Sequence, residues 1–136
     1  MLSFHENARA GLTNGFAVTP GNWQEYMGIS VSGAQTFAME IRFDDPVYIN
    51  SIESHYYQDS SSGIALPESV VYEYLVRSRP NDNIYVYHAF GDEQRLGSGS
   101  QITSTARRTM AILADGVRIT VQPGGTWTFL DEIWVE

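Results

Sequence analysis

Apolar and polar residues alternate with a period of two along much of this chain. Residues 37–43 read Phe-Ala-Met-Glu-Ile-Arg-Phe, with large apolar side chains at every odd position. Strand side chains point alternately to two faces, so this pattern predicts a strand with one buried face. The same alternation predicts strands over 70–77, 84–90 and 129–135.

Turn-forming residues separate the predicted strands. Asp44-Asp45-Pro46 predicts a turn, followed by a strand over 47–57 in which Ile49 and Ile52 are out of phase, as at a β-bulge. The polar segment 79–83 predicts the turn of a hairpin between the strands on either side of it.

Glycines mark the later connections. Segment 91–104 is polar and punctuated by glycine, which predicts a long surface loop. Asp115-Gly116 offers the positive φ that a tight turn requires, and therefore predicts a hairpin between 111–113 and 117–121. Pro123-Gly124-Gly125 is expected to end the second strand of that hairpin.

These elements indicate one all-β domain. The sequence shows no sustained helical period, and only 6–12 and 23–27 are candidates for a short helical turn. About seven short strands with Gly, Pro and Asn turns favour an antiparallel β-sandwich of jelly-roll type or a barrel. A length of 136 residues suits a single domain over 1–136.

Net charge disfavours two classes of partner. The chain carries 8 basic residues, all arginine, against 16 acidic ones, for a formal net charge of −8. Nucleic acids and anionic membrane surfaces need a concentrated positive field, which this distribution does not offer. No apolar stretch approaches the ~20 residues of a membrane span, so no membrane insertion is expected.

Cysteine is absent from the sequence, which excludes disulfides, thiolate metal sites and a cysteine nucleophile. The N-terminus has no basic region followed by an apolar run, so we expect no standard secretion signal. Localisation stays open on these grounds, with an extracellular surface or a virion favoured.

Motifs of common enzyme classes are missing. The sequence has no G-x-S-x-G elbow, P-loop or G-x-G-x-x-G, and the run His5-Glu6-Asn7-Ala8-Arg9 lacks the second histidine of H-E-x-x-H. His88 shares its strand parity with apolar neighbours, which favours a hydrogen-bonded core or edge histidine over a metal ligand.

Adjacent carboxylates do not suggest catalysis either. A glycosidase needs two carboxylates that face each other across a cleft. Asp44 and Asp45 are interpreted as a turn, and Asp92 and Glu93 as a solvated loop. We therefore expect a protein that is not an enzyme.

Aromatic residues near predicted loops favour sugar recognition. A ring stacks on the C–H face of a pyranose while nearby amides, carboxylates and guanidinium groups bond the hydroxyls. Trp23 with Tyr26, and Tyr57 with Asp59, are combinations of this kind. The alternative for each ring is packing in the core.

Five segments together resemble a known family, the galactose-binding-like (discoidin, or coagulation factor 5/8 type C) β-sandwiches. In chain order they are Leu12-Thr13-Asn14-Gly15, which is similar to "L-T-D-G"; 37–52, similar to the family's paired strands; 63–70, similar to "G-I-x-x-P-x-x-V"; Ala106-Arg107-Arg108 with Val117-Arg118-Ile119; and Asp131-Glu132-Ile133-Trp134-Val135, similar to "D-E-I-x-V". The resemblance implies a non-catalytic binding module, most often for carbohydrate.

The resemblance also implies a structural calcium ion. Its ligands here would be carbonyl oxygens of Leu12 and Gly15, the side chain of Asn14, and Glu132. Asn14 stands where the family has aspartate, which removes one negative charge and should weaken the site. The alternative is that Asn14-Gly15 is only a turn and Glu132 pairs with an arginine.

The ligand site of the family lies in loops at one end of the sandwich. The residues we expect to bind ligand there are Trp23, Tyr57, Asp59 and Arg95. A glycan is the first partner this suggests.

Two rival functions stay open. The first is a structural or adhesion subunit of a phage particle or other large assembly, which would use the same fold to dock on protein. A start at Met1 without a secretion signal favours this alternative. The second is a glycosidase of an unfamiliar kind.

Overall fold

The computed structural model describes residues 2–4, 27–31, 36–59, 61, 63–80, 83–96, 101–125 and 127–136. These residues form eight strands and no α-helix. The strands are β1 (Leu2–Phe4), β2 (Met27–Val31), β3 (Phe37–Tyr57), β4 (Ser69–Arg77), β5 (Tyr85–Ala89), β6 (Gln94–Arg95), β7 (Gln101–Gln122) and β8 (Trp127–Val135). No helix in this part of the chain has the length and apolar character to cross a membrane.

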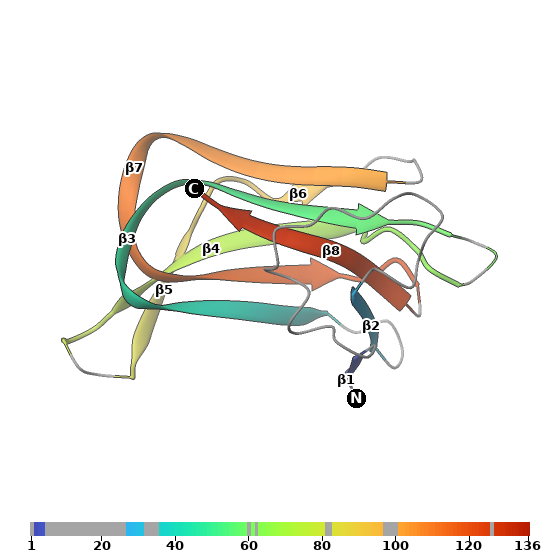
Figure 1. Cartoon of the computed structure of the whole chain (residues 1–136), viewed down its shortest axis with the longest axis horizontal. Helices are drawn as coiled ribbons and strands as arrows, with labels where there is room; N and C mark the ends of the chain where they lie inside the picture. Colours follow the sequence, from blue (N-terminus) through green and yellow to red (C-terminus); the bar gives the residue numbers. More distant parts are fainter. Residues whose placement is uncertain are drawn as a thin grey trace.

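All strand pairs are antiparallel, and the path of paired strands runs β1-β2-β8-β3-β7-β4-β5, with β6 paired to β4. The two longest strands, β3 and β7, bend together, which folds this path into two layers (Figure 1). One layer holds β1, β2, β8, the second half of β3 and the first half of β7. The other holds the remaining halves with β4, β5 and β6. The predicted antiparallel β-sandwich is confirmed.

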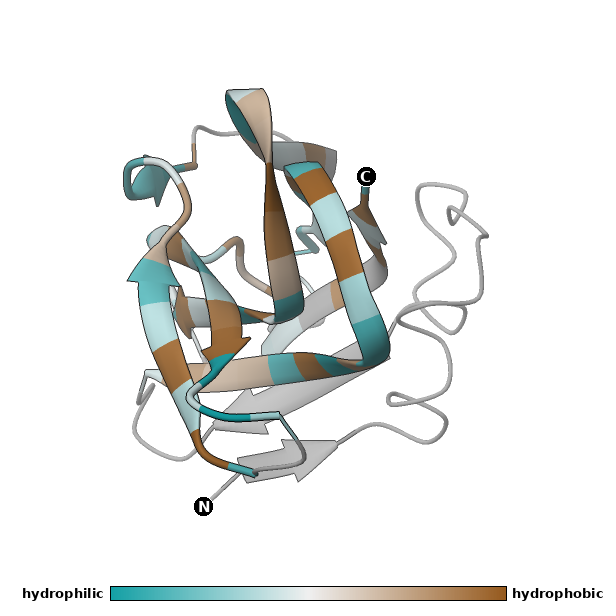
Figure 2. Ribbon diagram, turned by 90° about the vertical axis from the view of Figure 1, so that its left-hand side faces the viewer, coloured by the Kyte–Doolittle hydropathy of each residue, from teal (hydrophilic) through white to brown (hydrophobic). Residues whose placement is uncertain are grey.

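The bend in β3 lies where the sequence predicted a turn. Asp44-Asp45-Pro46 falls in a register shift between Arg42 and Val47, inside one continuous strand. A second register shift between Ile49 and Ser51 confirms the predicted bulge. Figure 2, which faces the bends, shows apolar and polar residues alternating along the strands.

The hairpin predicted at Asp115-Gly116 is wrong. Residues on both sides of this dipeptide pair with β3: Leu113 lies opposite Tyr48, and Gly116 itself lies opposite Arg42. The strand β7 therefore continues through the expected turn and only bends there. A glycine is required here for space, because a Cβ on Gly116 would lie 2.6 Å from the carbonyl oxygen of Ile41. Close backbone approach, and not a positive φ, explains this residue.

The surface loop predicted over 91–104 is also shorter than expected. Gln94–Arg95 forms β6, and β7 already begins at Gln101. The hairpin of β4 and β5 and the terminal strand β8 are confirmed. His88 lies exposed on β5, at the end of the strand path, with its ring stacked 5.0 Å from that of Tyr74.

Both layers contribute to one core. Its fully buried members include Ile52, Tyr56 and Leu130 from the first layer and Tyr72 and Val121 from the second. Within this core the Tyr72 hydroxyl lies 2.7 Å from Ser54 Oγ and donates a hydrogen bond to the carbonyl oxygen of Ser104 at 3.1 Å. The two layers are thus joined by hydrogen bonds as well as by apolar contact.

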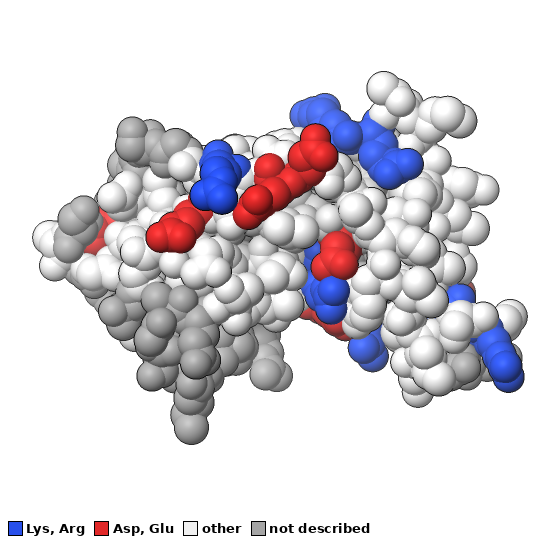
Figure 3. Space-filling view, turned by 180° about the vertical axis from the view of Figure 1, so that it is seen from behind, with Lys and Arg blue, Asp and Glu red and all other residues white. Residues whose placement is uncertain are grey.

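The outer face of the second layer is covered by arginine and tyrosine. The guanidinium carbon of Arg118 lies 3.7 Å from the ring centroid of Tyr87, and the same guanidinium pairs with Glu73 at 2.8 Å. Glu40 accepts a hydrogen bond from the Tyr87 hydroxyl, which raises the pKa of that tyrosine. On the face seen in Figure 3, acidic and basic side chains mix over the middle of the molecule, and arginine predominates toward the right-hand end of the view.

Candidate functional site

Two of the predicted ligand residues lie at the end of the sandwich opposite the bends. This loop end comprises the described residues of the segment after β3 (58–59, 61 and 63–68), residues 123–125 after β7, and β6 beside the start of β4 (Figure 1). Asp59 belongs to the first of these segments, and Arg95 to β6, where it pairs with Ser69. Trp23 lies outside the described residues.

Asp59 is held in a tight loop. Its Oδ1 accepts hydrogen bonds from the backbone N–H of Ser61 at 3.1 Å and from Ser61 Oγ at 2.6 Å. Its backbone exchanges two hydrogen bonds of 2.9 Å with Ile64, and Gly63 closes the loop with a φ of 74°. These contacts fix the loop that carries the carboxylate.

Tyr57 is placed differently from the expectation of an exposed ring. The side chain is 3% exposed and packs in a small cluster with Ile64 and Trp127. It anchors the loop end onto the sandwich, and a sugar cannot stack on a ring that is covered in this way. Trp127 packs on the same cluster and is partly exposed. The sequence alone did not identify this residue as a candidate for ligand binding.

Arg95 lines a pocket between β6 and the first residues of β7, which we call the edge pocket. It has a volume of about 160 Å³ and is lined by Gln94, Arg95, Leu96, Ile102, Thr103, Ser104 and Thr105. The Ser104 hydroxyl is buried and has no hydrogen-bond partner among the described residues. Residues with amide, guanidinium and hydroxyl groups thus line a pocket that is smaller than the roughly 300 Å³ at which small-molecule sites begin.

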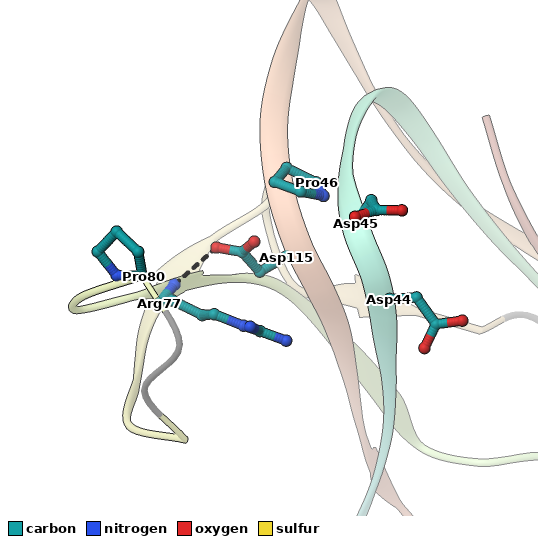
Figure 4. Close-up of a pocket in the computed structure, with 6 residues that line it drawn as sticks. All are labelled: Asp44, Asp45, Pro46, Arg77, Pro80 and Asp115. Carbon is teal, nitrogen blue, oxygen red and sulfur yellow. Dashed lines mark hydrogen bonds between the residues drawn. The ribbon is translucent and has the colours of Figure 1, made fainter.

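A larger pocket lies at the bends, at the opposite end of the sandwich. This corner pocket has a volume of about 370 Å³ and is lined by Asp44, Asp45, Pro46, Arg77, Pro80 and Asp115 (Figure 4). Asp115 Oδ2 accepts a hydrogen bond of 2.7 Å from the backbone N–H of Arg77, which ties β7 to the end of β4. The sequence did not indicate this pocket, because each of its acidic segments has the composition of a turn.

The predicted calcium site falls outside the described part of the structure. Leu12, Asn14 and Gly15 are not described, and Glu132 is described only as a backbone position in β8. Across the residues that are described, no three acidic or histidine side chains are grouped to hold a metal ion. The calcium ion therefore stays a prediction from the sequence.

Comparison with known sequences gives no match, either to a protein-family model or to a curated protein. Comparison with solved structures does. The family 32 carbohydrate-binding module of NanJ from C. perfringens, in complex with galactose, superposes with a TM-score of 0.58 at 12% identity, over 99% of this chain and 91% of that one. The chain has a galactose-binding-like fold.

A second neighbour of this galactose-binding-like domain is part of a longer protein. A mutant GH29 fucosidase from Ruminococcus gnavus, in complex with fucose, matches with a TM-score of 0.57 at 13% identity. The match covers 93% of this chain but 21% of the fucosidase. The domain thus corresponds in fold to about a fifth of that chain.

Proposed function

We propose that this domain is a non-catalytic carbohydrate-binding module. The observation that carries the proposal is the match to a galactose-bound module along nearly the full length of both chains. Fold alone does not fix function, so the groups at the loop end must also suit a sugar.

The loop end offers hydrogen-bonding groups of both kinds. Arg95 can donate to sugar oxygens, and Gln94 keeps one amide N–H beside the bond it donates to the Asp92 carbonyl oxygen. The Thr103 hydroxyl can donate or accept, whereas Thr105 Oγ1 already donates to Glu53 Oε1 at 3.0 Å and can only accept. Asp59 lies at the same end in a loop held by Ser61. Trp23, which the sequence places among the ligand residues, would supply the stacking ring.

The absence of catalysis is part of the same proposal. Glycoside hydrolysis needs two carboxylates across a cleft. The described residues that line the edge pocket, where we propose that the sugar binds, include no carboxylate, and the aspartates of the corner pocket lie at the opposite end of the sandwich. The domain also matches a minor part of the fucosidase chain, which agrees with an accessory role beside a catalytic domain.

A glycan array tests the proposal with matched variants. We expect the wild-type domain to bind a defined set of glycans, and Arg95→Met to lose that signal. Arg107→Met is the control, because Arg107 is equally exposed but lines neither pocket. Trp23→Ala should behave like Arg95→Met. An array without binding, or equal signals from wild type and Trp23→Ala, would overturn the proposal.

Docking within a large assembly is the second candidate. Tyr48 and Leu113 are cross-strand neighbours at the bend, 68% and 45% exposed, and Met110 nearby on β7 is 78% exposed. Exposed apolar side chains of this kind favour protein contact. Sedimentation of the pure chain, and identification of the particle that carries it by mass spectrometry, would test this function.

A further inference from the structure

The corner pocket is assembled from three separate segments. The bend of β3 supplies 44–46, the end of β4 with its following turn supplies Arg77 and Pro80, and the bend of β7 supplies Asp115. The hydrogen bond from Arg77 N–H to Asp115 holds two of these segments together. The two prolines restrict the backbone further.

The charged groups of this pocket do not satisfy one another. The Arg77 Nε is buried without a hydrogen-bond partner among the described residues. No ion pair joins its guanidinium to Asp44, Asp45 or Asp115 in that part of the chain, although Arg77 reaches into the space between Asp44 and Asp115 (Figure 4). The Nε itself is sealed from solvent, so the donors open to a ligand oxygen are the two terminal guanidinium nitrogens of Arg77.

The Arg77 side chain is nevertheless held in place. Its guanidinium carbon lies 5.7 Å from the ring centroid of Tyr85, on the neighbouring strand. This contact, on a ring that Arg42 also approaches at 4.6 Å, restricts the Arg77 side chain, so less side-chain freedom is lost on binding.

The chemistry of the lining selects the ligand. Guanidinium nitrogens only donate and carboxylates only accept, so a compound whose groups do both can bridge them. Hydroxyls of a sugar have this property, and Pro46 and Pro80 offer apolar walls for its C–H face. Three carboxylates against one guanidinium leave the lining negative, which repels an acidic sugar. The volume of about 370 Å³ falls within the range of small-molecule sites.

We propose that the corner pocket is a second saccharide subsite, which binds an uncharged sugar residue and rejects a sugar acid. The proposal rests on the carbohydrate-binding function but concerns the end of the sandwich opposite the loop end. A domain with a subsite at each end could bridge two glycan chains, which raises avidity without any new contact at either site.

Site-resolved NMR titration of the ¹⁵N-labelled domain tests the subsite. The probes are galactose, fucose, glucose and glucuronic acid, each raised to tens of millimolar. For at least one neutral sugar we expect saturable shifts of the amides of Asp45, Arg77 and Asp115. Glucuronic acid should cause none at these positions, and equal shifts with it would overturn the charge argument.

Variants separate this subsite from the loop end. Arg77→Met should raise the dissociation constant measured at the amides of the corner pocket at least tenfold and leave the shifts near Asp59 and Arg95 unchanged. Arg79→Met, at an exposed neighbouring position, is the control and should change neither set of shifts. If Arg77→Met does not fold, Asp45→Asn replaces it, with Asp92→Asn as control. Shifts confined to the loop end would overturn the subsite and leave the proposed function standing. No saturable shift anywhere would overturn both.

Discussion

Ser54 and Tyr72 lie on opposite layers of the sandwich, and their hydroxyl oxygens are 2.7 Å apart in its core. Tyr72 also donates to the carbonyl oxygen of Ser104. The Tyr72 hydroxyl thus serves as a hydrogen-bond partner for two buried polar groups of the facing layer, the Ser54 hydroxyl on β3 and the Ser104 carbonyl on β7. The hydroxyl is therefore as much a part of the core as the ring.

Tyr72→Phe should reduce the free energy of unfolding by about 1–3 kcal/mol, because Ser54 and Ser104 lose a partner while buried. Urea denaturation followed by circular dichroism measures the change. Tyr48→Phe is the control, since Tyr48 is 68% exposed, and should be neutral. Equal effects of the two substitutions would contradict the role of the hydroxyl.

Alkaline pH should weaken the fold. Burial raises the pKa of both Tyr56 and Tyr72 above the ordinary value of 10.0. Above that value the unfolded chain loses tyrosine protons that the folded chain retains, so stability is complete below about pH 10 and falls as pH rises further. Unfolding free energies measured from about pH 9 to 11 should decline, and less steeply in Tyr56→Phe. An unchanged slope in that variant would contradict the assignment.

Gly116→Ala should destabilise the domain by about 1–3 kcal/mol, because its Cβ would lie 2.6 Å from the Ile41 carbonyl oxygen at the bend. Gly63→Asn is the comparison. Gly63 has a left-handed φ of 74° and open space around its Cβ position, so asparagine should cost little there. Thermal unfolding of both variants measures the two changes in stability. An unchanged melting temperature in Gly116→Ala would contradict the claim that the backbones at the bend lie too close for a Cβ.

Arg118→Met should lower the unfolding free energy by about 1 kcal/mol, because it removes both the contact with the Tyr87 ring and the ion pair with Glu73. Salt screens the ion pair but affects the ring contact less. The cost should therefore shrink, without vanishing, between low and high ionic strength. A cost that disappears in salt would assign the whole effect to Glu73.

The strands could be predicted from the sequence because alternation is a local signal. The bends could not. Asp44-Asp45-Pro46 and Asp115-Gly116 are both rich in turn-forming residues. The sequence does not show that the strand residues on either side of the first segment pair with those on either side of the second. That pairing joins residues far apart in the chain, such as Tyr48 and Leu113, which are 65 positions apart. The pairing brings together two of the three segments that form the corner pocket, and the sequence alone predicts these two as separate turns.

The loop end shows a similar division. Asp59 and Arg95 both lie at the loop end, Asp59 on the segment after β3 and Arg95 on β6. Their role in ligand binding stays a prediction. The burial of Tyr57 could not be predicted, because the residues that cover it, Ile64 and Trp127, come from two different loop segments. Chain position alone does not distinguish an aromatic anchor from an aromatic platform.

Calorimetric titration of the wild-type domain with the glycan selected on the array measures sugar binding in solution. We expect saturable heat, loss of that heat in Arg95→Met, its retention in Arg107→Met, and recovery of the glycan unaltered. No heat from the wild type, or a glycan that is cleaved during the titration, would show that the domain is not a non-catalytic carbohydrate-binding module.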